Sequence, residues 1–172
     1  MLYRQIYTHI LGVSAVALFL GATTFAQNQQ DQNFVKTAME INLAEIQIGH
    51  LVLKQGASED VRKFGQRMIT DHTRLENEIT PIAAKIGITP PTELAPDDQA
   101  LLTKLKGESG AEFDETYVHA MVEGHRKAVQ LYKAEETDAQ DAAVKSAATH
   151  GEPVIAEHLR LAEHLKSTMG KS

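Results

Sequence analysis

The amino-acid sequence predicts an all-α protein, an antiparallel four-helix bundle with a short extra helix between its second and third long helices. Apolar residues recur at alternating spacings of three and four in four long segments, which is the period of an amphipathic α-helix. No segment alternates apolar and polar residues between turn motifs, as a half-buried strand would. Four helices of about 20–30 residues with mostly short connections favour an antiparallel bundle.

Residues 1–26 have the pattern of a secretory signal peptide. Arg4 supplies a positive charge, residues 11–20 (LGVSAVALFL) form an apolar core, and Ala26 ends a cleavage motif of small residues. We therefore expect cleavage before Gln27 and a mature chain in the periplasm. The alternative is an uncleaved membrane anchor, although the apolar run is shorter than the roughly 20 residues that span a bilayer.

The mature chain is expected to form a single domain over residues 33–168, preceded by a polar, glutamine-rich leader over residues 27–32. The first helix is predicted over residues 33–55, because a glycine follows it. The second is predicted over residues 58–86, because its first residue is a serine that can cap it and a glycine follows its last residue. Pro81 should kink this helix, since proline lacks the backbone N–H.

The connection after the second helix is the longest in the chain. Residues 88–95 contain two adjacent prolines and should be extended, and residues 96–104 or so should form the short extra helix. The third helix is predicted over residues 109–136, where the capping box S-x-x-E opens it. The fourth is predicted over residues 138–167, with an aspartate as its N-cap. Glycine and proline within residues 151–153 should interrupt it.

Composition excludes several classes of function. The chain has no cysteine, so it has neither disulfides nor thiolate metal ligands. Removal of residues 1–26 takes away one basic residue, which leaves 16 Lys and Arg against 23 Asp and Glu. This acidic balance argues against nucleic acid as a partner, and we expect no integral membrane contact after signal cleavage.

In each of the four predicted long helices, the apolar residues form a stripe along the face expected to pack in the core. Each stripe is interrupted once, near mid-helix, by a side chain that can bind a metal. These four residues are Glu45, His72, His125 and His158. Asp71 and Glu157 each precede one of these histidines, and they are candidates for further ligands or for hydrogen-bond acceptors. The histidines that fall off the stripes, and are expected to be exposed, are His50, His119, His150 and His164.

The four interrupting residues allow two interpretations. Neutral imidazole with carboxylate suits one transition-metal ion, such as Fe, Zn, Cu or Mn. Alternatively, the residues form a polar core layer that fixes helix register, each histidine being bonded to a carbonyl or an acid. Counted from the predicted helix ends, His158 lies ~13 Å from the level of His125 at 1.5 Å per residue. A break near Gly151 or a longer turn is then needed to level the two.

Several short motifs cover nearly the whole mature chain in order. They are A-E-x-x-x-G from Ala44, F-x-x-x-M-x-x-D-H from Phe64, G-I-T-x-P from Gly87, H-x-x-A from His125 and P-x-x-x-x-H-L from Pro153. At these residues the chain resembles the exported bacterial "domain of unknown function 4142" proteins, often labelled predicted outer-membrane proteins. The resemblance implies a ferritin-like four-helix bundle outside the cytoplasm and no settled activity. The Glu-x-x-His pairs of ferritin-like di-iron enzymes are absent, because apolar residues stand three before the stripe histidines: Ile69, Val122 and Ile155.

Two hypotheses for function follow. The first is an exported metal-binding protein for storage, buffering or stress protection. The alternative is a non-catalytic envelope or stress module with a purely structural histidine layer, acting through contacts with an envelope protein or a second copy of the chain. An enzyme is less favoured, because the sequence holds no P-loop, dinucleotide fingerprint or G-x-S-x-G motif.

Overall fold

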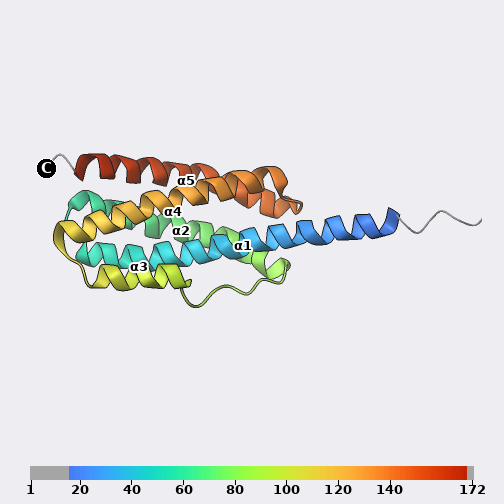
Figure 1. Ribbon diagram of the computed structural model, residues 1–172, viewed down its shortest axis with the longest axis horizontal. Helices are drawn as coiled ribbons and strands as arrows, with labels where there is room; N and C mark the ends of the chain where they lie inside the picture. The colour runs from blue at the N-terminus through green and yellow to red at the C-terminus, as the bar shows by residue number, and fades with distance from the viewer. Residues whose placement is uncertain (1–15, 170–172) are drawn as a thin grey trace, which may run out of the picture.

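The computed structural model of the chain describes residues 16–169, and side chains from residue 29 onward. This part contains five helices and no strand, which confirms the predicted all-α fold (Figure 1). The helices are α1 (Val16–Gln55), α2 (Glu59–Lys85), α3 (Pro96–Lys106), α4 (Gly110–Asp138) and α5 (Ala142–Met169). The four long helices form the bundle, and α3 is the predicted short extra helix.

The bundle consists of two helical hairpins, α1–α2 and α4–α5. The chain after α2 returns along the bundle through an extended linker and α3, so α4 starts at the end where α1 turns into α2 (Figure 1). As a result α2 and α4 run in the same direction. Helix α1 contacts α4 and α2 contacts α5, so each long helix lies antiparallel to both of its neighbours. Helix α3 packs outside the bundle against α1 and α4.

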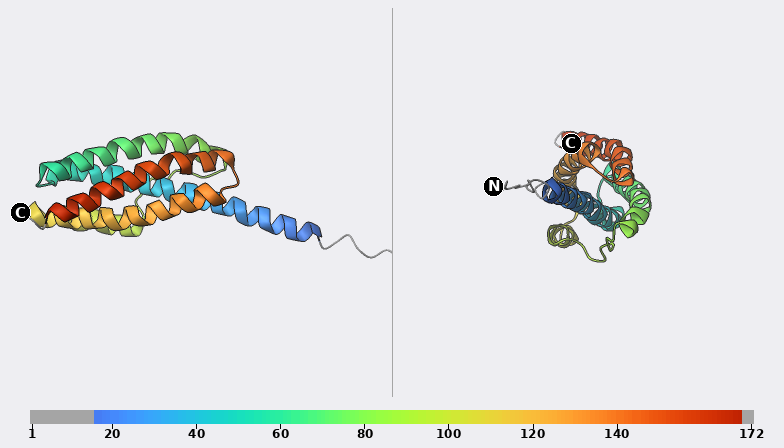
Figure 2. Two further views of the ribbon diagram at one scale, coloured as in Figure 1. Left: turned by 90° about the horizontal axis from the view of Figure 1, so that it is seen from above. Right: turned by 90° about the vertical axis from the view of Figure 1, so that its right-hand side faces the viewer.

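Helix α1 starts earlier than predicted. It is continuous from Val16, so residues 27–32 are helical and do not form a separate leader. Its N-terminal turns project beyond the bundle (Figure 2). Residues 11–15, half of the apolar core of the proposed signal, lie outside the described residues, and signal cleavage stays a prediction. Among the described helices, none is both long and apolar enough to cross a membrane.

Helix α2 begins and ends as the sequence indicates. The Ser58 hydroxyl accepts a hydrogen bond from Val61 N at 3.1 Å, which confirms the predicted N-cap. Gly87 has a positive φ of 78°, and Ile88 N donates to Ala83 O at 2.8 Å, which closes the C-terminus. Pro81 lies inside one unbroken helix, on its exposed side.

The second hairpin differs from its prediction at three points. Asp138 is the last residue of α4, and the N-cap of α5 is Asp141, whose carboxylate accepts from Ala143 N at 2.7 Å. Helix α5 is unbroken through residues 151–153. A Cβ at Gly151 would overlap the Tyr132 ring, so this glycine allows close packing and does not end the helix. Ser109 takes the predicted N-cap position of α4, but its side chain makes no capping hydrogen bond.

Each hairpin caps the turn of the other. Asp31 on α1 accepts hydrogen bonds from the backbone N–H of Gln140 and Asp141 at 3.1 and 2.8 Å. Asp114 on α4 accepts from the N–H of Ala57 and Ser58 at 2.9 and 2.8 Å. Both aspartates are buried. They satisfy N–H groups at the starts of α5 and α2, which intrahelical bonds leave free, and so tie the hairpins together at both ends.

The apolar core forms two clusters, one toward each end of the bundle. One includes Phe34, Leu75, Ile79, Tyr132 and Val144. The other includes Ile48, Phe64, Met68, Phe113 and Tyr117. In each long helix the predicted metal-binding residue falls between the segments that belong to these clusters. The polar residues therefore form one layer between two apolar halves.

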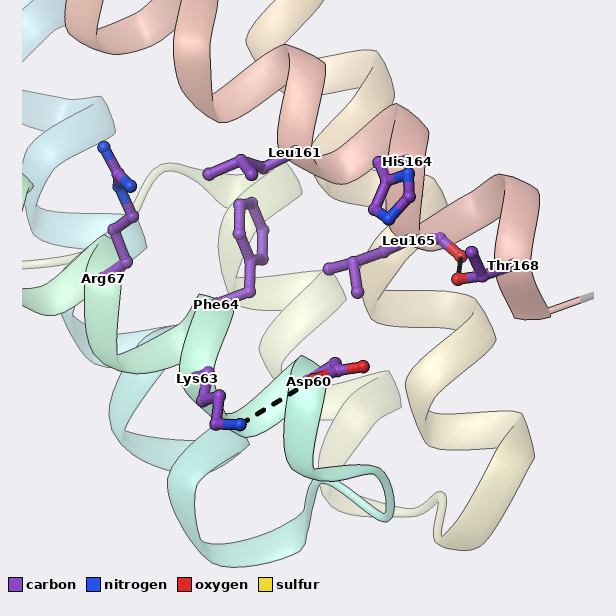
Figure 3. A pocket seen from close by; sticks show the side chains of 8 residues that line it. All are labelled: Asp60, Lys63, Phe64, Arg67, Leu161, His164, Leu165 and Thr168. Carbon is purple, nitrogen blue, oxygen red and sulfur yellow. Dashed lines mark hydrogen bonds and ion pairs between the residues drawn. The ribbon is translucent and has the colours of Figure 1, made fainter.

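A groove runs along the surface between α2 and α5 (Figure 3). Its volume is about 360 Å³. Phe64, Leu161 and Leu165 supply its apolar lining, and Lys63 and Arg67 lie at its edge. The Phe64 ring also lies edge-on to the His158 ring, with 6.5 Å between their centroids. This ring therefore stands between the groove and the polar layer.

Candidate metal centre

Three histidines from three helices meet in the middle of the bundle. His72 on α2, His125 on α4 and His158 on α5 each offer a ring nitrogen, and these nitrogens lie within 4.8 Å of one another. The ring centroids are 5.2–5.8 Å apart. All three residues are at most 2% exposed. The sequence singled out these three residues, and the structure places them in a single cluster.

The observed helix ends explain why His158 lies level with His125. His125 is 13 residues before Asp138, the last residue of α4, and His158 is 16 residues after Ala142, the first residue of α5. The offset of three residues is ~4.5 Å along the axis. The expected ~13 Å mismatch at 1.5 Å per residue is therefore wrong, because the predicted α4 ends too early and the predicted α5 starts too early.

The imidazole of His72 is oriented by a short chain of hydrogen bonds. Its Nδ1 lies 2.9 Å from the Oδ1 of Asn42, and the amide nitrogen of Asn42 donates to the Glu76 carboxylate at 3.1 Å. Because a carboxylate only accepts, the Asn42 nitrogen must face Glu76 and its oxygen must face His72. The Nδ1 of His72 is therefore the protonated, donating nitrogen.

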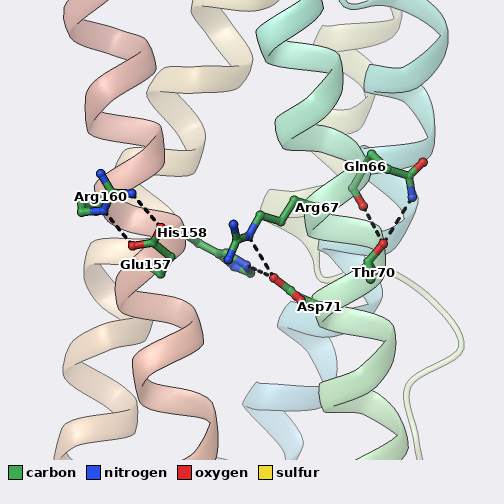
Figure 4. Close-up of polar contacts among 7 residues, drawn as sticks. All are labelled: Gln66, Arg67, Thr70, Asp71, Glu157, His158 and Arg160. Carbon is green, nitrogen blue, oxygen red and sulfur yellow. Dashed lines mark hydrogen bonds and ion pairs between the residues drawn. The ribbon is translucent and has the colours of Figure 1, made fainter.

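The other two imidazoles also donate outward. His125 Nδ1 donates to the backbone oxygen of Met121 at 3.0 Å. His158 Nε2 donates to the Asp71 carboxylate at 2.9 Å, and the same carboxylate oxygen accepts from Arg67 Nε at 3.2 Å (Figure 4). Both acceptors lack a proton, so these ring nitrogens carry the hydrogen.

The remaining nitrogen of each ring is buried without a hydrogen-bond partner. These atoms are His72 Nε2, His125 Nε2 and His158 Nδ1. In a neutral imidazole whose other nitrogen donates, this nitrogen carries a lone pair. Buried polar atoms without partners are rare because each costs free energy. Three such lone pairs in one cluster match the tautomers that metal-bound histidines adopt, where the second nitrogen donates to an acceptor outside the site.

Burial keeps the three rings neutral. It lowers the pKa of His72 well below the usual value, and the neighbouring His125 and His158 lower it further. Burial and His158 lower the pKa of His125 to about 4, although the bond to Met121 opposes this. Burial also lowers the pKa of His158, against the opposing effect of Asp71. The rings are therefore ready to bind a cation near neutral pH without first losing a proton.

Glu45 lies beside the cluster without joining it. Its Oε1 is 3.8 Å from His125 Nδ1, and its Oε2 is buried with no hydrogen-bond partner. Burial, with a smaller contribution from Asp98, raises the pKa of Glu45 to about 8. The hydroxyl of Tyr117 is also buried without a partner. A bound cation would lower the cost of ionising Glu45.

The remaining predicted residues have different surroundings. Asp71 accepts the hydrogen bond from His158, as described above. Glu157 instead forms an ion pair with Arg160 on the same helix at 2.7 Å, and its carboxylate points away from the His158 ring (Figure 4). The histidines expected to be exposed are so in the structure: His50, His119, His150 and His164.

Sequence reasoning missed the hydrogen-bonding residues around the histidines. Asn42 and Glu76 orient His72, and Tyr117 adds a buried hydroxyl. Asn42 lies three residues before Glu45 on α1, so helical spacing could have placed it on the same face. Glu76 likewise lies one turn after His72 on α2.

The fold and this layer define a class, an all-α four-helix bundle with three buried histidines in its core. The chain belongs to the family named "Domain of unknown function (DUF4142)", whose model matches residues 20–165. No curated protein matches the chain significantly.

Two solved structures share the fold. One is a DUF305 fragment from Deinococcus radiodurans, with a TM-score of 0.69 and 12% identity, covering 83% of this chain and 97% of that one. The other is a DUF305 protein from Streptomyces coelicolor that is predicted to be secreted. It has a TM-score of 0.70 and 16% identity, covering 82% of this chain and 94% of that one. At these identities the likeness concerns the fold alone.

Proposed function

We propose that this protein is an exported metal-binding protein that holds one transition-metal ion between His72, His125 and His158. One observation carries the proposal. Each of the three rings donates one nitrogen to an acceptor outside the cluster and leaves its other nitrogen buried without a partner. A purely structural layer would pair these nitrogens with protein donors.

The donor set favours a borderline transition metal over Ca²⁺ or Mg²⁺, which prefer oxygen ligands. Among divalent ions, affinity should rise from Mn²⁺ through Fe²⁺ to Cu²⁺, with Zn²⁺ below Cu²⁺. Tetrahedral ligation at 2.0–2.1 Å places nitrogens ~3.3 Å apart. In the structure the distances between one ring nitrogen of each histidine are at most 4.8 Å, so binding requires each distance to shorten by ~1.5 Å or less.

The site suits a single ion. Glu45 lies beside the cluster, 3.8 Å from the outward Nδ1 of His125, and it would have to turn toward the free nitrogens to serve as a fourth ligand or as an acceptor for metal-bound water. A di-iron centre needs several bridging and terminal carboxylates. Capacity is therefore stoichiometric, which fits buffering or sequestration of metal in the periplasm, including during stress, better than mineral storage.

The test measures metal in the mature chain, produced without a polyhistidine tag. Elemental analysis follows desalting, and the metal-free protein is then titrated with Zn²⁺, Cu²⁺, Fe²⁺ and Mn²⁺. We expect about one equivalent of at least one metal to remain bound. His72→Ala and His125→Ala should lose it, whereas His119→Ala and His150→Ala, which remove exposed histidines from α4 and α5, should retain it.

A second readout separates a metal site from a structural layer. Replacing His125 with Leu removes a buried lone pair without a partner and introduces an apolar side chain of similar size, and the Met121 oxygen that His125 Nδ1 contacts is a backbone acceptor inside α4. A metal site predicts that metal-free His125→Leu is at least as stable as the metal-free wild type near neutral pH. A large loss of stability, together with no bound metal in the wild type, would assign the layer to structure alone.

A further inference from the structure

The three histidines are sealed inside the bundle, so an ion needs a route to them. Each residue is at most 2% exposed. Two hollows approach the layer from opposite sides, the groove between α2 and α5 and a smaller cavity between α1, α3 and α4. They differ in what separates them from the ring nitrogens and in the charge that they present.

The groove between α2 and α5 is poorly suited to admit a cation. The Phe64 ring lines it (Figure 3) and packs edge-on against the His158 ring, so it separates the groove from this histidine. The acids in and beside it are already paired with cations, Asp60 with Lys63 and Asp71 with Arg67, so among the described residues the groove offers no unpaired carboxylate to an entering ion. The Asp71 carboxylate that Arg67 bonds also orients His158, so opening the groove here would disturb the site.

The cavity between α1, α3 and α4 has the opposite character. It holds about 80 Å³, which is room for a hydrated path. Glu45 and His125, two residues of the candidate centre, form part of its wall, and Asp98 on α3 forms another part. Glu45 is 7% exposed and its Oε2 has no hydrogen-bond partner. Asp98 is half-buried, so the two carboxylates lie at different depths.

We propose that this cavity is the route by which a divalent transition-metal ion reaches the three histidines, with Asp98 as the outer and Glu45 as the inner carboxylate. The proposal rests on the proposed function and assigns a route to the same site. A divalent ion must exchange water for protein ligands one at a time, and carboxylate oxygens at successive depths lower the cost of each exchange. Acidic walls also raise the local concentration of cations and the association rate.

The route gives a role to α3 and to Gly124. Helix α3 covers the cavity from outside and brings Asp98 to it. Gly124 lies in the cavity wall in the middle of α4, and a Cβ there would meet no atom within 4 Å. A glycine in a helix interior costs up to about 1 kcal/mol relative to alanine. Here it leaves open space next to His125.

The test follows the kinetics of Zn²⁺ capture by the metal-free mature chain, with a chromogenic zinc chelator as the donor. Asp98→Asn keeps the shape and removes the charge, and Gly124→Leu fills the cavity without touching a histidine. We expect the association rate to fall about tenfold in each, within the range of electrostatic effects on rates. Stoichiometry should stay at one ion, and Gly124→Leu should slow release by the same factor as capture.

Two control variants test whether slower capture depends on charge in the proposed cavity and not on charge elsewhere. Asp97→Asn changes the exposed neighbour of Asp98, and Asp60→Asn removes an acid from the groove between α2 and α5. Both should capture Zn²⁺ at the wild-type rate within about twofold, because neither charge lines the proposed route. Unchanged rates in both Asp98→Asn and Gly124→Leu would overturn the route while leaving the metal site intact, as would slowing by Asp60→Asn alone. A wild type that binds none of the four metals would remove the proposed function, and the route with it.

Discussion

The two hairpins have the same construction and make different contributions to the polar layer. Each receives a buried aspartate from the other at its turn, and each brings its helices close together at glycine. The α4–α5 hairpin supplies two of the three imidazoles. The α1–α2 hairpin supplies one imidazole and the surrounding polar groups, including Asn42 and Asp71. Neither hairpin can build the site alone, so an ion bound there would join the two.

The largest effect should come from removing any one ligand. Loss of His72 from the first hairpin, or of His158 from the second, should lower metal affinity by more than about 100-fold, beyond the range seen for outer hydrogen-bonding partners. Isothermal titration of the metal-free variants measures this. A loss confined to one hairpin would show that the cluster does not act as one site.

Metal binding should also stabilise the joined hairpins. An ion at 100 times its dissociation constant adds about 2.7 kcal/mol to the free energy of unfolding. For a chain of this size we expect the melting temperature to rise by about 5–10 °C. Calorimetry with and without Zn²⁺ tests this, and His72→Ala should show no rise. An equal rise in that variant would locate the binding elsewhere.

The imidazoles and Glu45 should give metal-free protein opposite responses to pH. Burial lowers the pKa of His125 to about 4, so the unfolded chain binds the proton more readily. The contribution of His125 to the free energy of unfolding is therefore fully present above about pH 6.5 and is lost as the pH falls toward 4. The raised pKa of Glu45, about 8, has the reverse effect. The contribution of this carboxyl to the free energy of unfolding is fully present below about pH 4.5 and is lost as the pH rises through 8.

Urea unfolding of metal-free protein across pH 4–9 separates the two contributions. His125→Leu should flatten the loss of stability on the acid side. Glu45→Gln should flatten the loss between pH 4.5 and 8, because the amide does not titrate. Each group can contribute up to about 1.4 kcal/mol per pH unit. Profiles parallel to that of the wild type in both variants would contradict the assigned neutral rings and protonated carboxyl.

An outer partner should matter less than a ligand. Asp71→Asn keeps the shape but weakens the acceptor for His158 Nε2, and such changes cost about 10–100-fold in metal affinity. Glu157→Gln is the matched control, because Glu157 precedes the same histidine on α5 but pairs with Arg160. Titration should place the control at wild-type affinity. Equal losses in both variants would assign the effect to surface charge.

The smallest effects should be those of the reciprocal caps. Asp31→Ala and Asp114→Ala each remove two hydrogen bonds to backbone N–H groups at a hairpin turn. We expect each to lower the free energy of unfolding by about 1–2 kcal/mol. Chemical denaturation should show similar losses, because the two contacts have the same form. A much larger loss for one would show that the two turns are not equivalent.

The sequence was sufficient for the fold and for the residues of the polar layer. Helical periodicity made His72, His125 and His158 visible as interruptions of apolar stripes, and Ser58 marked a helix start through its own short-range chemistry. Other features depend on contacts between distant segments. Asp31 looked like part of a polar leader, because its partners are 109 and 110 residues away.

The predicted interruption of the last helix at glycine and proline was wrong for a similar reason. Gly151 reads as a break from sequence alone, but its role is set by the Tyr132 ring on the neighbouring helix. Placing the start of α5 too early then displaced His158 from its level. Short-range patterns identify which residues face the core, and only the packed hairpins determine at what height they meet.

X-ray absorption at the edge of the bound metal tests the central claim most directly. Mature protein loaded with one equivalent of Zn²⁺ and desalted should show imidazole scattering from three nitrogen ligands at about 2.0–2.1 Å. A spectrum with oxygen donors alone, or no metal left after desalting, would contradict a three-histidine centre between the hairpins.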